Sequence, residues 1–243
     1  MNPFHQRGSG SPHRQGDRRR IVSQIYHTGA TMSDEVQFSA RSRLLPAVDL
    51  TRRHSSRDFF NVPIDMESLG SILYAAQGHD NIRRKRLIPS AGSSYPLRMR
   101  VAAQNVSSLT SGLYLYEPDR HVLITIEEAS SPLSEIASAA FDAPWIGQAS
   151  AALLVSAEFE RTTVPYAHQP PDGRAEHYVW LEAGHAAQNV ALATATLSLA
   201  TVFVGGFHDD LMSKAFRLAS HEHPIGVMPV GHGPQIPELS HKP

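Results

Sequence analysis

The 243-residue chain contains no cysteine, which excludes disulfide bonds, thiolate catalysis and cysteine-ligated metal sites. It also lacks an uninterrupted apolar run of the roughly eighteen residues that a membrane-spanning helix needs. Because the net charge is only −1, bulk electrostatic binding to nucleic acid or to an acidic membrane is not expected. The basic residues at the start are not followed by an apolar core, so no signal peptide is predicted from them. We therefore expect a cytoplasmic protein.

Several short catalytic signatures are missing as well. The chain has no P-loop, no G-x-G-x-x-G dinucleotide fingerprint and no nucleophile elbow. Its 14 histidines do not have the spacing of a metal site. His185 has no histidine or carboxylate four residues later, His221 and His223 fall in a turn, and carboxylates are not clustered near either position. No metal is predicted, and a metal-binding protein remains only a remote alternative.

The longest apolar segment is Trp180–Phe207, which is rich in alanine. Its small residues recur at steps of three and four, which predicts a helix, and the helix is apolar nearly all round, which predicts burial. A short strand is expected over Thr201–Val204, and Gly205-Gly206 follows, where backbone can approach a ligand closely. The segment is compatible with a cofactor cradle or with an ordinary core helix and turn.

Residues 1–45 are predicted to be a flexible basic tail and arm, and residues 46–243 the folded domain. Asp65 can cap a helix that Gly78 closes, and Asn81–Pro89 reads as a basic loop. Arg161–Glu176 reads as a long polar loop and a candidate lid. Together the elements predict an α+β fold with a mostly antiparallel sheet. Strands are expected at Met99–Ala103, Gly112–Tyr116, Val122–Ile126, Ala151–Ser156 and Ile225–Val230, and helices at Ser131–Phe141 and Asp209–Leu218.

The segment RRHSSRDF, Arg52–Phe59, concentrates guanidinium, imidazole and hydroxyl donors. Its side chains Arg53, His54, Ser55 and Arg57 can together hold a dianionic phosphate by charge-assisted hydrogen bonds. A basic surface loop explains the same composition, so both interpretations stay open at this point.

Taken in order, RHSSRDF, PSAGSSYPL, GLYLYEPDRHVL, EAGHAAQN, VGGF and PVG resemble the FMN-dependent nitroreductase family over residues 47–235. The branch that they resemble most is that of the SagB/ThcOx-type dehydrogenases, which includes azoline oxidases of peptide natural-product pathways. The resemblance implies a nitroreductase-like fold and a homodimer with the long central helix at its interface. It also implies FMN as cofactor, NAD(P)H as a possible reductant, and no separate nicotinamide-binding domain.

The resemblance also implies which residues bind the cofactor. The basic segment would grip the phosphate and ribityl chain, and the PSAG loop would approach the flavin from the other subunit. The loop after the central helix would lie over the flavin ring, and the last strand would end near the phosphate. The implied residues are Arg53, His54, Ser55 and Arg57, then Pro89, Ser90, Ala91, Gly92 and Ser93, then Gly205, Gly206 and Phe207, and finally Gly231 and His232.

One feature departs from the azoline oxidases, which carry a Lys-Tyr pair before the EAGH helix. Here Tyr166 is present and is the candidate catalytic residue, but Pro165 stands in the place of the lysine. A proline cannot exchange a proton, so azoline oxidation is in doubt, although Arg161, His168 or Arg174 could substitute.

The predicted function is therefore hydride transfer through the flavin, to or from a small molecule or a modified peptide. The alternative is an accessory or scaffold protein of a biosynthetic complex, with little or no turnover. The missing lysine and the basic tail are the features that motivate this alternative.

Overall fold

Seven antiparallel strands form the main sheet within the part of the chain that the computed structural model describes, residues 35–38, 50–80 and 82–234. The strand order is β1-β6-β5-β4-β7-β9-β8, and every neighbouring pair runs antiparallel. This confirms the predicted α+β fold with a mostly antiparallel sheet. The strands are β1 Glu35–Gln37, β4 Leu97–Ala103, β5 Gly112–Glu117, β6 Val122–Glu128, β7 Ala151–Ala157, β8 Ala200–Thr201 and β9 His223–Gly231.

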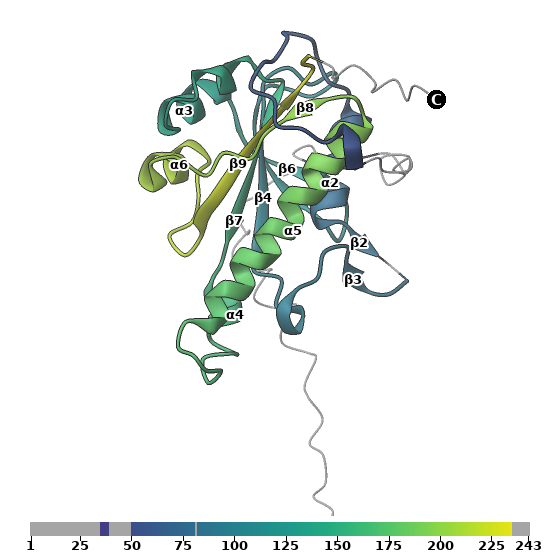
Figure 1. Cartoon of the computed structure of the whole chain (residues 1–243). Helices are drawn as coiled ribbons and strands as arrows, with labels where there is room; N and C mark the ends of the chain where they lie inside the picture. Colours follow the sequence, from purple (N-terminus) through teal and green to yellow (C-terminus); the bar gives the residue numbers. More distant parts are fainter. Residues whose placement is uncertain (1–34, 39–49, 81, 235–243) are drawn as a thin grey trace, which may run out of the picture. The chain divides into compact units, whose positions relative to one another are not determined.

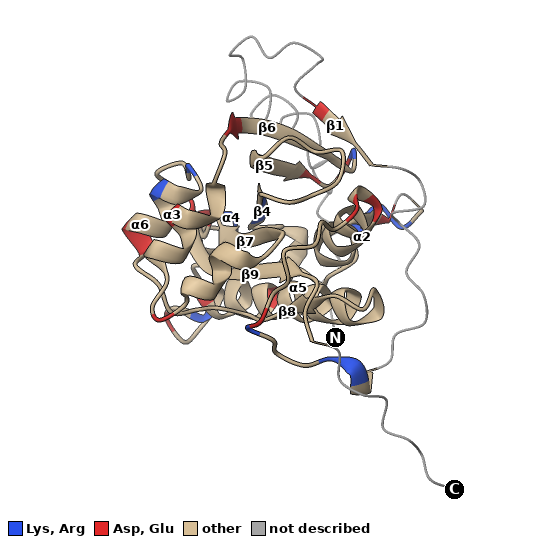
Figure 2. Cartoon of the chain, turned by 90° about the horizontal axis from the view of Figure 1, so that it is seen from above, with Lys and Arg blue, Asp and Glu red and all other residues tan. Residues whose placement is uncertain are grey.

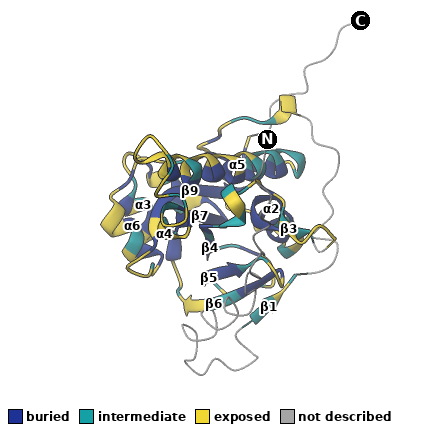
Figure 3. Ribbon diagram, turned by 90° about the horizontal axis from the view of Figure 1, so that it is seen from below, coloured by how far each residue is buried: buried dark blue, intermediate teal, exposed yellow. Residues whose placement is uncertain are grey.

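Helices cover both faces of this sheet (Figure 1). Successive strand side chains point to opposite faces, so Val101 packs into one apolar cluster and Ala102 into the other. The first cluster lies under α2 Met66–Gln77 and α5 Arg174–Thr196, and the second under α3 Pro132–Ala139 and α6 Asp209–Ala215. Figure 3 shows the central strands buried between these two layers of helices.

Helix α2 begins where the sequence predicts. The Asp65 carboxylate accepts a hydrogen bond from the Ser68 backbone N–H at 2.6 Å, which satisfies one of the free donors of the first turn. Leu69, Ile72 and Leu73 are fully buried, and Gly78 follows the last turn. The predicted apolar face is therefore the face that packs on the sheet.

Helix α5 is longer and less buried than predicted. It begins at Arg174 rather than near Trp180, so it takes up the end of the predicted polar loop. Val179, Ala186 and Val190 are buried, but Trp180 and Leu181 are 51% and 60% exposed. The expectation of burial all round is wrong for a single chain, because the sheet and α2 cover only one side of the helix.

Other differences are local. The predicted loop at Asn81–Pro89 contains strand β3, Lys85–Arg86, which pairs with β2, His79–Asp80. The predicted lid contains the short helix α4, Glu160–Thr163, and the predicted strand Thr201–Val204 is reduced to β8 and one bridge from Val204 to Val227. Single 3-10 turns complete the fold as η3 Leu50–Arg52, η4 Ala91–Ser93 and η5 Pro144–Gln148.

Strand β1 lies within the predicted tail, where Val36 pairs with Leu123 of β6. The rest of the prediction for residues 1–45 falls outside the described residues, apart from Phe38. The described residues belong to one compact unit that starts at Glu35. None of its helices is long and apolar enough to cross a membrane.

Candidate functional site

The basic segment Arg52–Phe60 lies against the end of the last strand. The Ser56 N–H donates to the Thr201 carbonyl at 3.0 Å, and the Phe60 N–H donates to the His232 carbonyl at 2.8 Å. Only a glycine fits at position 233, between the basic segment and β8, because a Cβ there would stand 2.5 Å from the Asp58 carbonyl oxygen and 2.7 Å from the Ala200 Cβ. The structure thus brings together two of the predicted cofactor-binding groups, the basic segment and Gly231-His232.

The arginines of this segment, among them Arg53 and Arg57, form no ion pair with any carboxylate that the structure describes. Their neighbour Arg52 donates to the Ser198 hydroxyl at 2.9 Å, and His54 Nδ1 lies 3.2 Å from the Arg52 carbonyl oxygen. The basic residues of this segment are seen near β8 in Figure 2. Two guanidinium groups without a carboxylate partner provide the donor chemistry that a phosphate requires.

The Gly205–Phe207 segment continues along the same edge of the sheet. Ala200 pairs with Gly231 and Thr201 with Val230, and three residues later Val204 bridges to Val227. Phe207 then bridges to Ala140, and the Phe141 N–H donates to the Gly206 carbonyl at 2.9 Å. The third predicted group therefore lies between β9 and the end of α3, on the edge that begins at the basic segment.

The PSAG loop, Pro89–Ser93, lies at the opposite end of the sheet (Figure 1). It precedes Leu97, which pairs with Ala157, whereas Ala103 pairs with Ala151 and Ala151 with Val230. Six strand steps correspond to roughly 20 Å. Within one chain, the structure does not bring the PSAG loop to the basic segment.

The PSAG loop is instead next to Tyr166, the candidate catalytic residue. Gly92 has a φ of +55°, and the Tyr166 phenol oxygen occupies the place where a Cβ would stand. Ser94 Oγ lies 2.7 Å from Thr162 Oγ1, and Arg161 Nε donates to the Ser94 carbonyl at 3.1 Å. The loop after β7 and the PSAG loop therefore form one unit, in which Tyr166 is half-buried and Pro165 exposed.

Glu182 of α5 is a functional candidate that the sequence analysis missed. Its side chain is buried with an exposed fraction of 3%, and its Oε1 has no hydrogen-bond partner. Burial raises the pKa of the Glu182 carboxyl to about 7, although a hydrogen bond from Ser90 and the charges of Arg86 and Arg161 act in the opposite direction. The sequence pattern could have identified this residue, because Glu182 occupies the same helical face as the apolar Val179 and Ala186.

A second buried polar cluster joins the strands at the PSAG end of the sheet. Arg100 of β4 forms a buried ion pair with Glu222, with Nη2 to Oε1 at 3.0 Å, and the Ser156 hydroxyl donates to the same carboxylate at 3.1 Å. His221 lies 3.9 Å from Glu158, so the expectation that no carboxylates cluster near His221 is wrong. Both carboxylates already pair with arginines, Glu222 with Arg100 and Glu158 with Arg98 and Arg161. That pairing opposes a cation site.

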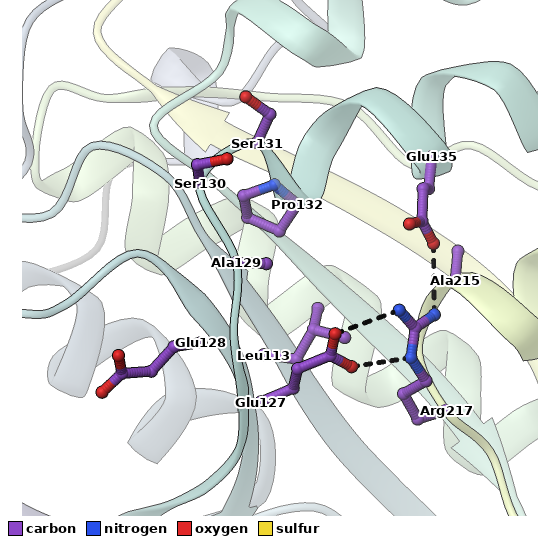
Figure 4. Close-up of a pocket in the computed structure, with 10 residues that line it drawn as sticks. All are labelled: Leu113, Glu127, Glu128, Ala129, Ser130, Ser131, Pro132, Glu135, Ala215 and Arg217. Carbon is purple, nitrogen blue, oxygen red and sulfur yellow. Dashed lines mark hydrogen bonds and ion pairs between the residues drawn. The ribbon is translucent and has the colours of Figure 1, made fainter.

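A surface hollow of about 390 Å³ lies between the end of β6 and α3 (Figure 4). Its carboxylates Glu127 and Glu135 both bind the Arg217 guanidinium, at 2.8 and 3.1 Å. None of the predicted cofactor-binding residues lines this hollow.

The sequence profile of the nitroreductase family matches residues 50–232. The chain is also 37% identical, over 184 residues, to protein MJ1384 of Methanocaldococcus jannaschii, whose name assigns it provisionally to the nitroreductases. That match covers 75% of this chain and 88% of the relative. The chain belongs to the nitroreductase family. As a nitroreductase-family protein it is an oxidoreductase. The residues that match the family include the basic segment, the PSAG loop, the Gly205–Phe207 segment and the end of β9.

Solved structures agree with this nitroreductase fold. A chain of Anabaena variabilis, provisionally named a nitroreductase, superposes with a TM-score of 0.63 at 21% identity. The match covers 75% of this chain but only 37% of that longer chain. A chain of the Escherichia coli microcin synthetase McbBCD, in complex with truncated pro-MccB17, superposes with a TM-score of 0.66 at 19% identity. That match covers 94% of this chain and 85% of the other.

Proposed function

We propose that this nitroreductase-family protein is an FMN-dependent oxidoreductase. The observation that supports it most is the pair Arg53 and Arg57, which have no carboxylate partner among the described residues and lie beside the end of β9. This donor set fits the dianionic phosphate of FMN, and His54, Ser55 and the backbone of Gly231 and His232 extend it.

The Gly205–Phe207 segment is proposed to receive the flavin ring. Gly205 and Gly206 carry no side chain that would keep a planar ring from the backbone, so their N–H groups can donate to it. When bound, FMN supplies hydride transfer between a reductant such as NAD(P)H and an acceptor, or from a substrate that it dehydrogenates. The residues of this chain bind it, orient it and cover one of its sides.

The site is proposed to be completed by a second copy of the chain. Within one chain the PSAG loop and Tyr166 lie at one end of β4 and β7 and the basic segment at the other, and these strands are roughly 20 Å long. The exposed face of α5 includes Trp180, Leu181 and the small Gly184, which suit close packing against a second helix. A homodimer can therefore place Pro89–Ser93 of one protomer beside the cofactor of its partner.

The substrate is proposed to be a small molecule or a modified peptide, as in the SagB-type dehydrogenases. The likeness to a microcin synthetase chain over 94% of this chain supports this branch, as does Tyr166 beside Gly92 of the PSAG loop. Tyr166 is proposed to exchange a proton with the substrate through its phenol oxygen. Pro165 has no group that can assist it.

The test begins with the absorbance spectrum of the purified protein and with release of the chromophore by heat. We expect flavin bands and free FMN in the supernatant. Arg57→Ala should weaken FMN retention at least tenfold, because a charge-assisted hydrogen bond is lost. Arg83→Ala, on the exposed tip of the β2–β3 hairpin, removes the same charge and should leave retention unchanged. Tyr166→Phe should keep FMN and lower kcat. A colourless protein that takes up no FMN would overturn the proposal in favour of an accessory scaffold.

A further inference from the structure

A second hollow, of about 370 Å³, lies between the β2–β3 hairpin and the PSAG loop. Its polar wall consists of Lys85, Arg86, Ser90, Ser93 and Tyr95, and Leu87, Ile88 and Pro89 complete it. The basic run Arg83–Arg86 supplies Lys85 and Arg86 to this wall, although the nitroreductase resemblance gives the run no role.

The polar side chains that line the hollow are all hydrogen-bond donors, and no carboxylate is among them. Lys85 Nζ donates to the Ser93 hydroxyl at 2.7 Å and has no carboxylate partner among the described residues. A cation that bonds only a neutral hydroxyl retains its full attraction for an anion. The hollow beside Arg217 is different, because its guanidinium is held by two carboxylates.

Arg86 forms the fixed part of the wall. Its guanidinium donates to the Gln77 carbonyl and side-chain oxygens at 3.3 and 3.2 Å, lies 3.4 Å from Asp119, and sits 5.5 Å from the centre of the Tyr95 ring. Ser93 and Tyr95 have positive φ angles of 57° and 47°, a conformation that costs about 1 kcal/mol or more for residues other than glycine. The surroundings therefore hold these donors in a strained but defined arrangement.

We infer that this hollow binds an oxyanion, a phosphate or a carboxylate, of the molecule that reacts at the cofactor. Lys85 and Ser93 donate to its oxygens, and Arg86 adds positive potential from behind. The inference rests on the proposed function for its role in turnover, because the proposed homodimer places the PSAG loop beside the partner's cofactor, where the substrate reacts. The same chemistry can come from the phosphates of a nicotinamide nucleotide or from a carboxylate on the acceptor.

The experiment compares the wild-type protein with the variants Lys85→Ala and Lys85→Arg. Each protein is used with the FMN that it retains on purification. Lys214→Ala removes one lysine charge from α6, whose residues do not line this second hollow, and serves as the control. Calorimetry measures the Kd for inorganic pyrophosphate and for 4-nitrobenzoate, independently of turnover. Steady-state kinetics then compare NADPH and NADH with uncharged N-benzyl-dihydronicotinamide, and 4-nitrobenzoate with nitrobenzene.

For Lys85→Ala we expect roughly tenfold weaker binding of at least one oxyanion, and an equal rise in KM for the substrate that carries it, because a hydrogen bond to a charged group is lost. The uncharged analogues should be unaffected, and Lys85→Arg should retain most of the binding. A response confined to the nucleotides identifies phosphate as the source, and one confined to 4-nitrobenzoate identifies carboxylate.

Equal Kd values for Lys85→Ala, Lys214→Ala and wild type, or no binding of either anion by wild type, overturn the inference. The flavin spectrum is recorded first, so a protein without FMN fails the proposed function in a separate measurement. The calorimetric result then tests the anion site independently of the proposed function.

Discussion

Glu182 is the residue whose protonation should matter most for folding. Its carboxyl is buried, one oxygen has no hydrogen-bond partner, and burial raises its pKa from 4.5 to about 7. Between these two pH values the folded state binds more protons than the unfolded state. The contribution of Glu182 is therefore most favourable below about pH 4.5 and is lost as the pH rises to about 7.

Glu182→Gln should remove this pH dependence, because the amide keeps the shape and stays neutral. We expect it to leave the free energy of unfolding nearly unchanged at pH 5. At pH 8 it should raise that free energy by up to about 3 kcal/mol, since one pKa unit corresponds to about 1.4 kcal/mol. Urea unfolding of both proteins from pH 5 to 8 measures the difference.

The control for this prediction is Glu176→Gln, on the exposed side of the same helix, which should change stability by less than about 0.5 kcal/mol at either pH. Parallel stability curves for wild type and Glu182→Gln would contradict the prediction. They would mean that the Glu182 carboxyl is already ionised at pH 5 or stays neutral at pH 8.

At the residue scale, the sequence indicates which positions carry chemistry better than it indicates their partners. The donors Arg53 and Arg57 are recognisable from RRHSSRDF, and Glu182 could have been recognised as a carboxylate on an apolar helical face. The ion pair of Arg100 with Glu222 could not, because 122 residues separate them and only strand pairing brings them together. Tyr166 against Gly92 depends in the same way on two loops from different elements.

Gly233 allows the basic segment to pack closely against the edge of the sheet at β8. Gly233→Ala would set a Cβ 2.5 Å from the Asp58 carbonyl oxygen and 2.7 Å from the Ala200 Cβ, and neither a backbone oxygen nor an alanine Cβ can rotate away. We expect a loss of about 1–3 kcal/mol in stability, the usual cost of overpacking. FMN retention should fall as well, because the segment that carries Arg53 and Arg57 must move off β8.

Thermal unfolding and FMN release measure these two effects. Gly147→Ala is the matched control, since a Cβ there has no heavy atom within 4 Å, and it should change neither quantity. If Gly233→Ala retains FMN as wild type does, the basic segment does not depend on its position against β8 for binding.

At the element scale, long periodic segments are predicted well and short ones poorly. Helix α2 follows from the Asp65 cap and a regular apolar face, and β4, β5, β6, β7 and β9 follow from apolar runs between turns. Strand β3 and the reduced β8 depend on pairing with a neighbour, since two residues carry too little pattern to indicate a strand. Helix α4 and the first turns of α5 were not predicted, because prolines and polar residues in the same stretch indicate a loop.

At the scale of the whole molecule, the composition of α5 conflicts with its burial in one chain. The sequence predicts a helix buried nearly all round, but only the face with Val179, Ala186 and Val190 is covered. The opposite face exposes Trp180 and Leu181, which single-chain folding does not explain. The proposed second copy, packed on this face, would resolve the conflict and would also bring a PSAG loop toward the partner's basic segment.

Gly184 lies on that exposed face, and a Cβ there has no heavy atom within 4 Å in the single chain. For an isolated protomer, Gly184→Arg should therefore be harmless or slightly stabilising, because glycine inside a helix costs about 0.5–1 kcal/mol relative to alanine. In a homodimer packed through α5, the same change buries an unpaired charge and a large side chain between two helices. We expect monomers and loss of FMN. Light scattering after size exclusion, with the flavin absorbance read on the same peak, measures both.

The control is Gly147→Arg, which adds the same charge at a glycine whose Cβ position is equally open, and which should leave mass and flavin unchanged. If Gly184→Arg keeps the mass and flavin content of wild type, α5 is not the dimer contact. The exposed Trp180 and Leu181 would then need another partner, and the PSAG loop would have to reach the cofactor by another surface. If instead Gly184→Arg has the mass of a monomer and no longer contains flavin, the cofactor site itself is shared between two chains, because the folded protomer alone cannot hold FMN.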